Sequence, residues 1–215
     1  MRGSIQELIT KSATPLKGHE ETFAIDATGF SDSRFGQWQK HKYRDEDEHR
    51  LWKKLHISCG VRSNIVTTAT VTKGTTHDQT QFEELVEMTD QYFDQGKVLA
   101  DKAYNARVNY DKAKELGAKA YIPFKDNITG KAGGSYEWMR MYKRFQNYRR
   151  DFLKKYHLRS NVESSFNLMK EKFGKNLRCK DQVALETEVL AKVLCYNICT
   201  VIRMIYELDL QFQDY

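Results

Sequence analysis

Four side chains able to act on a phosphate ester stand at fixed offsets in residues 156–170, YHLRSNVESSFNLMK. They are Tyr156, Arg159, Glu163 and Lys170. Read as one α-helix at about 100° per residue, the segment places all four within an arc of roughly 60°. One face then carries a carboxylate that could bind a metal ion, two cations that could bind phosphate, and a phenol. A solvated polar face with ordinary pairing between residues four apart would show the same pattern.

A neighbouring face of the same segment is apolar. Its members are spaced by three or four residues: Leu158, Val162, Phe166 and Met169. This spacing predicts that the helix docks on a hydrophobic core. A docked helix would hold its single carboxylate still.

Two further acids end short apolar runs that are typical of strands. Asp26 ends residues 22–26, TFAID, and Asp101 ends residues 96–101, GKVLAD. A strand-terminal carboxylate can be a metal ligand, although such residues often only begin turns.

The order of the predicted strands should bring these two acids together. Residues 52–60 and 63–73 read as an antiparallel hairpin, which with residues 22–26 makes a three-stranded meander. Strand, helix and strand then follow over residues 96–124, the pattern of a parallel crossover. The first and fourth strands should therefore lie side by side with their acids level.

Three converging carboxylates, Asp26, Asp101 and Glu163, cannot all stay ionised in a dry cleft without compensation. Divalent cations supply that compensation, and oxygen ligands select Mg²⁺ or Mn²⁺. Two such ions can activate a nucleophilic oxygen and stabilise the leaving oxygen at a phosphodiester.

Basic residues are concentrated around these motifs. The chain of 215 residues has a net charge of +6, but residues 131–180 alone hold 14 Lys and Arg against four Asp and Glu. Aromatic residues alternate with the cations over residues 136–150, which favours contact with nucleic acid. A solvated amphipathic helix whose rings face the core is the alternative.

The remaining segments carry weaker signals. Residues 1–20 are polar and weakly patterned, so we expect a partly ordered lead-in, and residues 36–50 read as an exposed excursion. Residues 183–208 predict a long apolar final helix. The chain reads as one domain.

Two motifs favour structural roles over chemistry. His77 and Asp78 could be a ligand pair, but a helix start capped by Thr76 or Asp78 explains them better. The four cysteines fit neither a metal knuckle nor a disulfide framework, so we expect small buried hydrophobic side chains.

No apolar run approaches the roughly 20 residues of a membrane span, and no signal peptide is visible, which predicts a soluble intracellular protein.

Four stretches together resemble a known family. They are AIDATGF with Asp26, WKKLHI followed by GTTHDQTQF, VLADKAYN with Asp101, and residues 156–170, which match the pattern Y-(2)-R-(3)-E-(6)-K at all four positions. The chain resembles, over residues 22–206, the DDE catalytic domain of transposases of bacterial and archaeal insertion sequences.

The resemblance implies an α/β, ribonuclease H-like fold with a central mixed five-stranded sheet flanked by helices. It implies that Asp26, Asp101 and Glu163 bind two Mg²⁺ or Mn²⁺ ions, and that Tyr156, Arg159 and Lys170 contact the transposon-end DNA. The implied reaction is metal-dependent cleavage at transposon ends and strand transfer of the 3′-hydroxyl into target DNA.

It further implies a homodimer assembled on double-stranded DNA, in the nucleoid-associated cytoplasm of a prokaryote. Residues 21–210 would be the catalytic domain with a short basic aromatic insertion at 125–155, and residues 1–20 the remnant of an N-terminal region. Two alternatives remain: a catalytically decayed DNA-binding remnant, and a ribonuclease H-like nuclease with another role.

Overall fold

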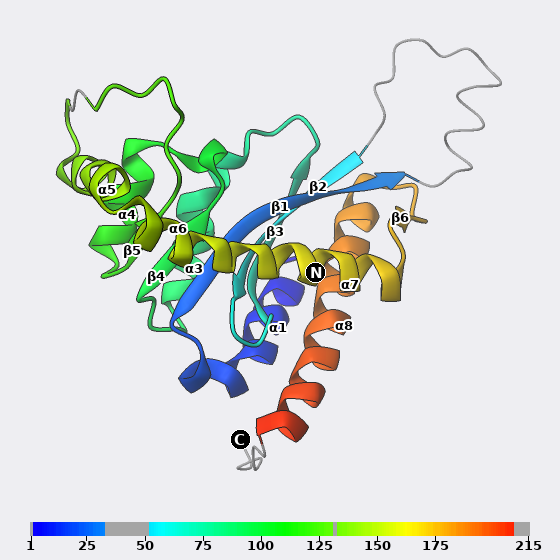
Figure 1. Cartoon of the computed structure of the whole chain (residues 1–215). Coiled ribbons are helices and arrows are strands. Elements are labelled where there is room, and N and C mark those ends of the chain that lie inside the picture. The colour runs from blue at the N-terminus through cyan, green and yellow to red at the C-terminus, as the bar shows by residue number, and fades with distance from the viewer. Residues whose placement is uncertain (1, 33–51, 131–132, 209–215) are drawn as a thin grey trace, which may run out of the picture.

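The computed structural model describes residues 2–32, 52–130 and 133–208 (Figure 1). The strands are β1 (Thr22–Asp32), β2 (Trp52–Gly60), β3 (Val66–Lys73), β4 (Lys97–Ala100), β5 (Lys119–Tyr121) and β6 (Asn176–Leu177). The α-helices are α1 (Arg2–Ala13), α3 (Phe82–Asp90), α4 (Arg107–Glu115), α5 (Tyr136–Asn147), α6 (Arg149–Tyr156), α7 (Ser160–Phe173) and α8 (Gln182–Leu208). Short 3₁₀ turns are η1 (Thr14–His19), η2 (Asp78–Gln81), η3 (Lys102–Tyr104) and η4 (His157–Arg159).

One mixed sheet forms the centre of the molecule, with strand order β3-β2-β1-β4-β5. The first three strands pair antiparallel as a meander, while β4 lies parallel to β1 and β5 parallel to β4. The ribonuclease H-like α/β fold and the parallel crossover are thereby confirmed. A two-residue sixth strand, β6, which the sequence did not predict, pairs with the far end of β1.

The first strand is longer than predicted. It does not end at Asp26 but continues to Asp32, because β2 keeps pairing with it as far as Ser31 and Trp52. Asp26 therefore lies within a strand and not in a turn.

Helices cover the sheet and close the core. Figure 1 shows α7 running across β1, and α3 packs on β2 and β3. The final helix is confirmed as α8, which packs against both α1 and β3.

The prediction of a partly ordered lead-in at residues 1–20 is wrong. This segment forms α1 and η1, and three of its apolar side chains, Ile9, Ala13 and Leu16, are fully buried. The sequence signal was weak because only these few positions face the core. The excursion predicted at residues 36–50 lies outside the described residues.

Two smaller expectations also need correction. Asp78 begins η2 without capping it, and no side chain caps α3 either. Of the four cysteines only Cys59 is buried, whereas Cys195 is exposed, because the periodic face of α8 that holds Cys195 points away from the sheet.

The length and composition of α8 would allow it to cross a membrane, contrary to the sequence prediction. An 18-residue window of this helix has a mean hydropathy of 1.5. Polar side chains on its buried face bond within the protein: Asn197 donates to the carbonyl of Val66 at 2.7 Å, and Lys192 to that of Asn176 at 2.9 Å. These contacts identify α8 as a core helix of this fold.

Candidate active site

Asp26 occupies the middle of β1, in the interior of the sheet. Its side chain is 19% exposed. Oδ1 accepts a hydrogen bond from the amide of Ala27 at 2.9 Å, and Oδ2 accepts one from Nη1 of Arg159 at 2.6 Å. A largely buried carboxylate is thus held by one amide and one guanidinium.

Asp101 follows the end of β4, beside Asp26. The parallel register pairs Ile25 with Ala100, so the next residue of each strand is an acid at the same level. Oδ1 of Asp101 accepts from the amide of Ala103 at 3.0 Å, which caps η3 and orients the carboxylate. This geometry agrees with the prediction that the two acids lie at the same level of neighbouring strands.

Glu163 lies on the first turn of α7, on the segment that crosses β1. Its carboxylate is 55% exposed and accepts from Nη2 of Arg159 at 2.6 Å. One guanidinium, which is 14% exposed, therefore joins Asp26 to Glu163. The sequence assigned Arg159 to phosphate and did not predict this bridge between acids 137 residues apart along the chain.

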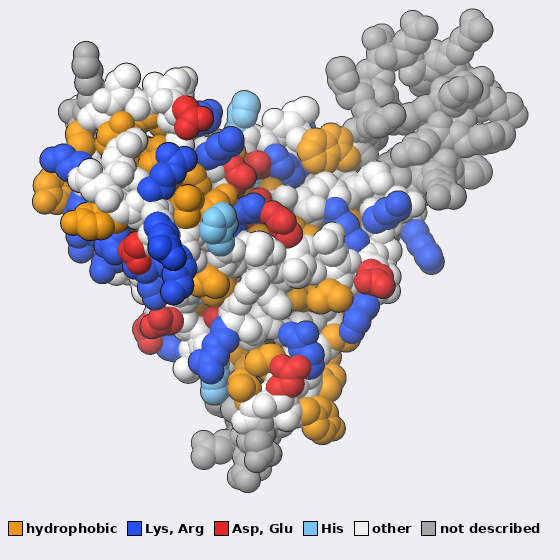
Figure 2. All heavy atoms as spheres, viewed as in Figure 1, with side chains coloured by type: hydrophobic (Ala, Val, Ile, Leu, Met, Phe, Trp, Pro, Cys, Tyr) orange, Lys and Arg blue, Asp and Glu red, His pale blue; other side chains and the backbone are white. Residues whose placement is uncertain are grey.

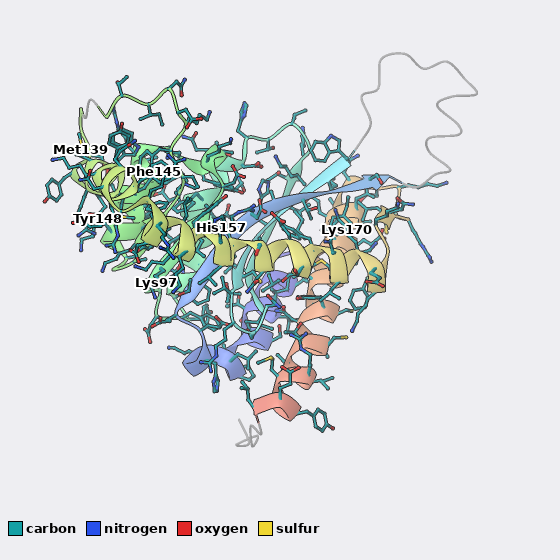
Figure 3. The ribbon with its side chains drawn as sticks, in the orientation of Figure 1. Lys97, Met139, Phe145, Tyr148, His157 and Lys170 are labelled. Carbon is teal, nitrogen blue, oxygen red and sulfur yellow. The ribbon has the colours of Figure 1, made fainter. Side chains whose placement is uncertain are left out.

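The segment of residues 156–170 is not one α-helix as predicted. Tyr156 ends α6, the 3₁₀ turn η4 follows, and α7 begins at Ser160. The tighter turn brings the Arg159 side chain over the Tyr156 ring, 5.8 Å from its centroid. Figure 3 marks His157 and Lys170 toward the two ends of this segment.

The apolar stripe of this segment is confirmed at three of its four positions. Val162, Phe166 and Met169 are buried under α7, but Leu158 is 46% exposed. Leu158 lies in η4, whose three-residue turn rotates it away from the core. Because the other three dock α7, Glu163 is held on a fixed element.

Lys170 reaches back to β1 from the last turns of α7. Its Nζ donates to the hydroxyl of Thr28 at 2.6 Å and lies 5.4 Å from the centroid of the Phe30 ring. Burial lowers the pKa of Lys170. Lys170 also lines an open pocket of about 490 Å³ with Lys175 and Arg178. Thr28 was missed by sequence reasoning, although its position two residues after Asp26 on a strand places both on one face.

Charge and burial oppose each other at Asp26. Burial raises the pKa of Asp26, the Ala27 amide and the Arg159 guanidinium lower it, and the neighbouring Asp101 charge raises it again; the net effect is upward. The folded site therefore disfavours the charged form of Asp26, chiefly through burial.

Tyr104 is a buried phenol on η3 whose pKa responds both to these acids and to Asp78 of a second polar cluster. Burial, and then the charges of Asp78, Asp26 and Asp101, raise the pKa of its phenol. Within the part of the chain described, the buried Tyr104 hydroxyl has no hydrogen-bond partner. This group was not singled out from the sequence.

The second cluster consists of Lys54, His56 and Asp78. Lys54 forms an ion pair with Asp78, whose Oδ1 lies 3.7 Å from Nδ1 of the fully buried His56. Nε2 of His56 contacts the hydroxyl of Thr72 at 2.9 Å. Asp78 is thus the ion-pair partner of Lys54 on β2. Lys54 and His56 are two residues apart on a strand and so lie on one face, and this spacing was the sequence signal that could have located the cluster.

A metal ion fits this site by the chemistry of its donors. Asp26, Asp101 and Glu163 offer the hard carboxylate oxygens that Mg²⁺ and Mn²⁺ prefer. Among residues 2–32, 52–130 and 133–208, no three acidic, histidine or cysteine side chains already converge on one point. Two of the three carboxylates, those of Asp26 and Glu163, instead share the guanidinium of Arg159, which supplies positive charge between them.

The basic aromatic region divides its rings between core and surface. Trp138 and Phe145 are buried against Phe124, while Tyr136 and Tyr148 are 83% and 67% exposed. The alternative of an amphipathic helix with rings facing the core therefore holds for Trp138 and Phe145, while contact of the exposed rings with nucleic acid stays a prediction.

Comparison with known protein families gives a match that covers most of the chain. The model of the family described as transposase DDE domain matches residues 17–198. This stretch contains all six predicted site residues and every strand of the sheet.

Proposed function

Because this chain belongs to the transposase DDE domain family, we propose that it cuts DNA at transposon ends and joins the freed 3′-hydroxyl to target DNA. Both steps are in-line displacements at a phosphodiester, so one site can perform them in turn. The observation that carries the proposal is the meeting of Asp26 and Glu163 on one guanidinium, with Asp101 next to Asp26 in the sheet.

We propose Asp26, Asp101 and Glu163 as the catalytic, metal-binding residues. They would hold two Mg²⁺ or Mn²⁺ ions, a role that DDE transposases generally require of their acids. When bound, the ions supply the charge that activates an attacking oxygen and stabilises the leaving oxygen. The raised pKa of Asp26 supports this assignment, because burial disfavours the charged carboxylate and a metal ion in the site would stabilise that form.

The cations of the segment are proposed to hold DNA. Arg159 donates one N–H to Asp26 and one to Glu163, and its side chain also has a hydrogen bond with Tyr156. The guanidinium has five N–H groups in all, so the remaining ones could donate to a phosphate oxygen. Lys170 lies on the same side of β1 as Asp26 and would bind the next phosphate through its ammonium. Tyr156 adds a ring and a hydroxyl beside Arg159.

A nicking assay tests this function. The wild-type chain is incubated with a labelled duplex that carries the element's terminal repeat, with Mg²⁺ present. We expect strand cleavage at the repeat end by wild type and none by Asp101→Ala, since this substitution removes a proposed metal ligand together with its contact to the Ala103 amide.

The other outcomes identify the alternative functions. Binding of the repeat without metal-dependent cleavage would indicate a catalytically decayed remnant. Cleavage of branched DNA with no preference for repeat ends would indicate a ribonuclease H-like nuclease of another role. Equal nicking by wild type and Asp101→Ala would refute the proposed site.

The organisation of the protein remains part of the proposal. Residues 21–210 would be the catalytic domain with a basic aromatic insertion at 125–155. We propose that it acts as a dimer assembled on DNA in the cytoplasm of a prokaryote, as its family suggests.

A further inference from the structure

A pocket of about 440 Å³ opens between α5, α6 and the edge strand β5, apart from the candidate active site. We call it the basic pocket. It is lined by Lys119, Arg140, Lys143 and Arg144, together with Tyr148 and Asp151. Figure 2 shows Lys and Arg side chains gathered over α5 and α6.

The positive charge of the basic pocket exceeds what its acids neutralise. Asp151 bonds Arg144 at 3.0 Å, and the nearly buried Glu137 bonds Arg140 at 2.5 Å. Lys119 and Lys143 are exposed and form no ion pair in the described residues. An anion placed here would therefore gain at least two unpaired cations.

The cations stand on a rigid support. The Arg144 guanidinium lies 5.9 Å from the centroid of the Tyr121 ring, and its Nε is buried without a hydrogen-bond partner in the part of the chain described. The indole of Trp138 donates from α5 to Oδ1 of Asn105 at 3.0 Å. Because Asn105 follows the turn capped by Asp101, the basic pocket is fixed relative to the candidate active site.

The chain leads directly from the basic pocket to the site. From α6 the backbone continues through η4 into α7, and Figure 3 shows His157 between Tyr148 and Lys170. Eleven positions separate Tyr148, which lines the basic pocket, from Arg159, and at about 1.5 Å per residue this is roughly 16 Å. Along one DNA strand, at 3.4 Å per nucleotide, this distance corresponds to about four to five nucleotides.

We propose that the basic pocket binds a backbone phosphate of DNA about four to five nucleotides from the bond that is cut. This inference rests on the proposed function for the position of the cut. The ligand is a phosphodiester, which either the transposon end or the target duplex could supply. The exposed Tyr148 hydroxyl adds a neutral donor to the cations.

Salt dependence of binding tests the contact. Lys119→Ala/Lys143→Ala should reduce the slope of log affinity against log salt by about 1, because the loss of one phosphate contact removes about 0.9. Lys17→Ala, on the exposed turn η1, is the control and should leave the slope unchanged. Both lysines of the basic pocket are exposed, so unchanged thermal melting would verify that the variant folds.

Neutral methylphosphonate linkages locate the phosphate. Placed singly along an end duplex and along an unrelated target duplex, a linkage four to five nucleotides from the cut should weaken wild-type binding. The same linkage should have no effect on the double variant. The duplex that shows this pattern is the one that the basic pocket holds.

Two different failures can be told apart. Equal salt slopes for wild type and the double variant, or a linkage effect that persists in the variant, would overturn the inference even if nicking is normal. Absence of nicking by wild type would overturn the proposed function, while a slope change confined to the double variant would still support DNA binding at the basic pocket.

Discussion

Arg159 acts as the cation of the acidic site in the structure, and replacing it with Met should expose that role. The substitution keeps an unbranched apolar stem, so it removes the charge with little change in packing. Asp26, at 19% exposure, would then keep only the amide of Ala27 as a partner.

The two ion pairs of Arg159 should contribute differently to the free energy of unfolding. Breaking a buried ion pair by removing one partner costs about 3–5 kcal/mol. Asp26 would keep its partial contact with solvent and its hydrogen bond from the Ala27 amide. We therefore expect Arg159→Met to lower the free energy of unfolding by about 2–3 kcal/mol near about pH 8. Glu163 is 55% exposed, and its pair should add less than about 1 kcal/mol.

The loss should depend on pH with a defined sign. Burial already raises the pKa of Asp26 in the folded protein, and removing Arg159 raises it further. A carboxyl whose folded pKa lies above its unfolded value stabilises the fold fully at low pH, and this contribution disappears as the pH rises through the folded pKa. The deficit of Arg159→Met should therefore be small near about pH 4 and complete near about pH 8.

Urea unfolding of four proteins measures the effect: wild type, Arg159→Met, Asp26→Asn and the double variant. Because an amide has no charge to compensate, Arg159→Met should cost little in the Asp26→Asn background. Adding Mg²⁺ should stabilise Arg159→Met more than wild type, since in wild type the ion competes with the guanidinium.

Two results would refute this reasoning. One is a cost of Arg159→Met that is the same with Asp26 and with Asn at that position. The other is a deficit that does not change with pH, which would mean that lost packing and not charge is responsible.

Three further predictions follow from single contacts. Burial lowers the pKa of His56 to about 4, so the stability that its neutral ring contributes above the unfolded pKa of about 6.5 should be lost as the pH falls toward about 4. His56→Gln should remove this pH dependence from the free energy of unfolding measured in urea. An unchanged pH profile would contradict the prediction. A Cβ at Gly60 would lie 2.5 Å from Cδ of the buried Glu20, so Gly60→Ala should cost about 1–3 kcal/mol, whereas Gly18→Ala, with open space around it, should cost far less. Lys170→Ala should lower the salt slope of DNA binding by about 1, and an unchanged slope would show that its ammonium does not bind phosphate.

Much of the fold could be predicted because its signals are local. The apolar and β-branched residues that mark the strands in residues 52–73 are neighbours in sequence. The parallel pairing of β4 and β5 followed from the geometry of the crossover, and the order of the strands along the chain placed β1 beside β4. The equal level of Asp26 and Asp101 could therefore be predicted from the order of the strands and the position of each acid at the end of an apolar run.

The sequence by itself determined which residue types stand at which spacing, and that was enough to select Asp26, Asp101 and Glu163 as candidate metal ligands and Tyr156, Arg159 and Lys170 as candidate DNA contacts. Only the tertiary structure decided that Arg159 bonds Asp26 and Glu163, that α1 is part of the core, and that Leu158 is exposed. Pairing between side chains far apart in the chain depends on how α7 lies across β1 and on the single 3₁₀ turn that precedes it. Helical periodicity describes one element at a time, so it does not contain the position of one element against another.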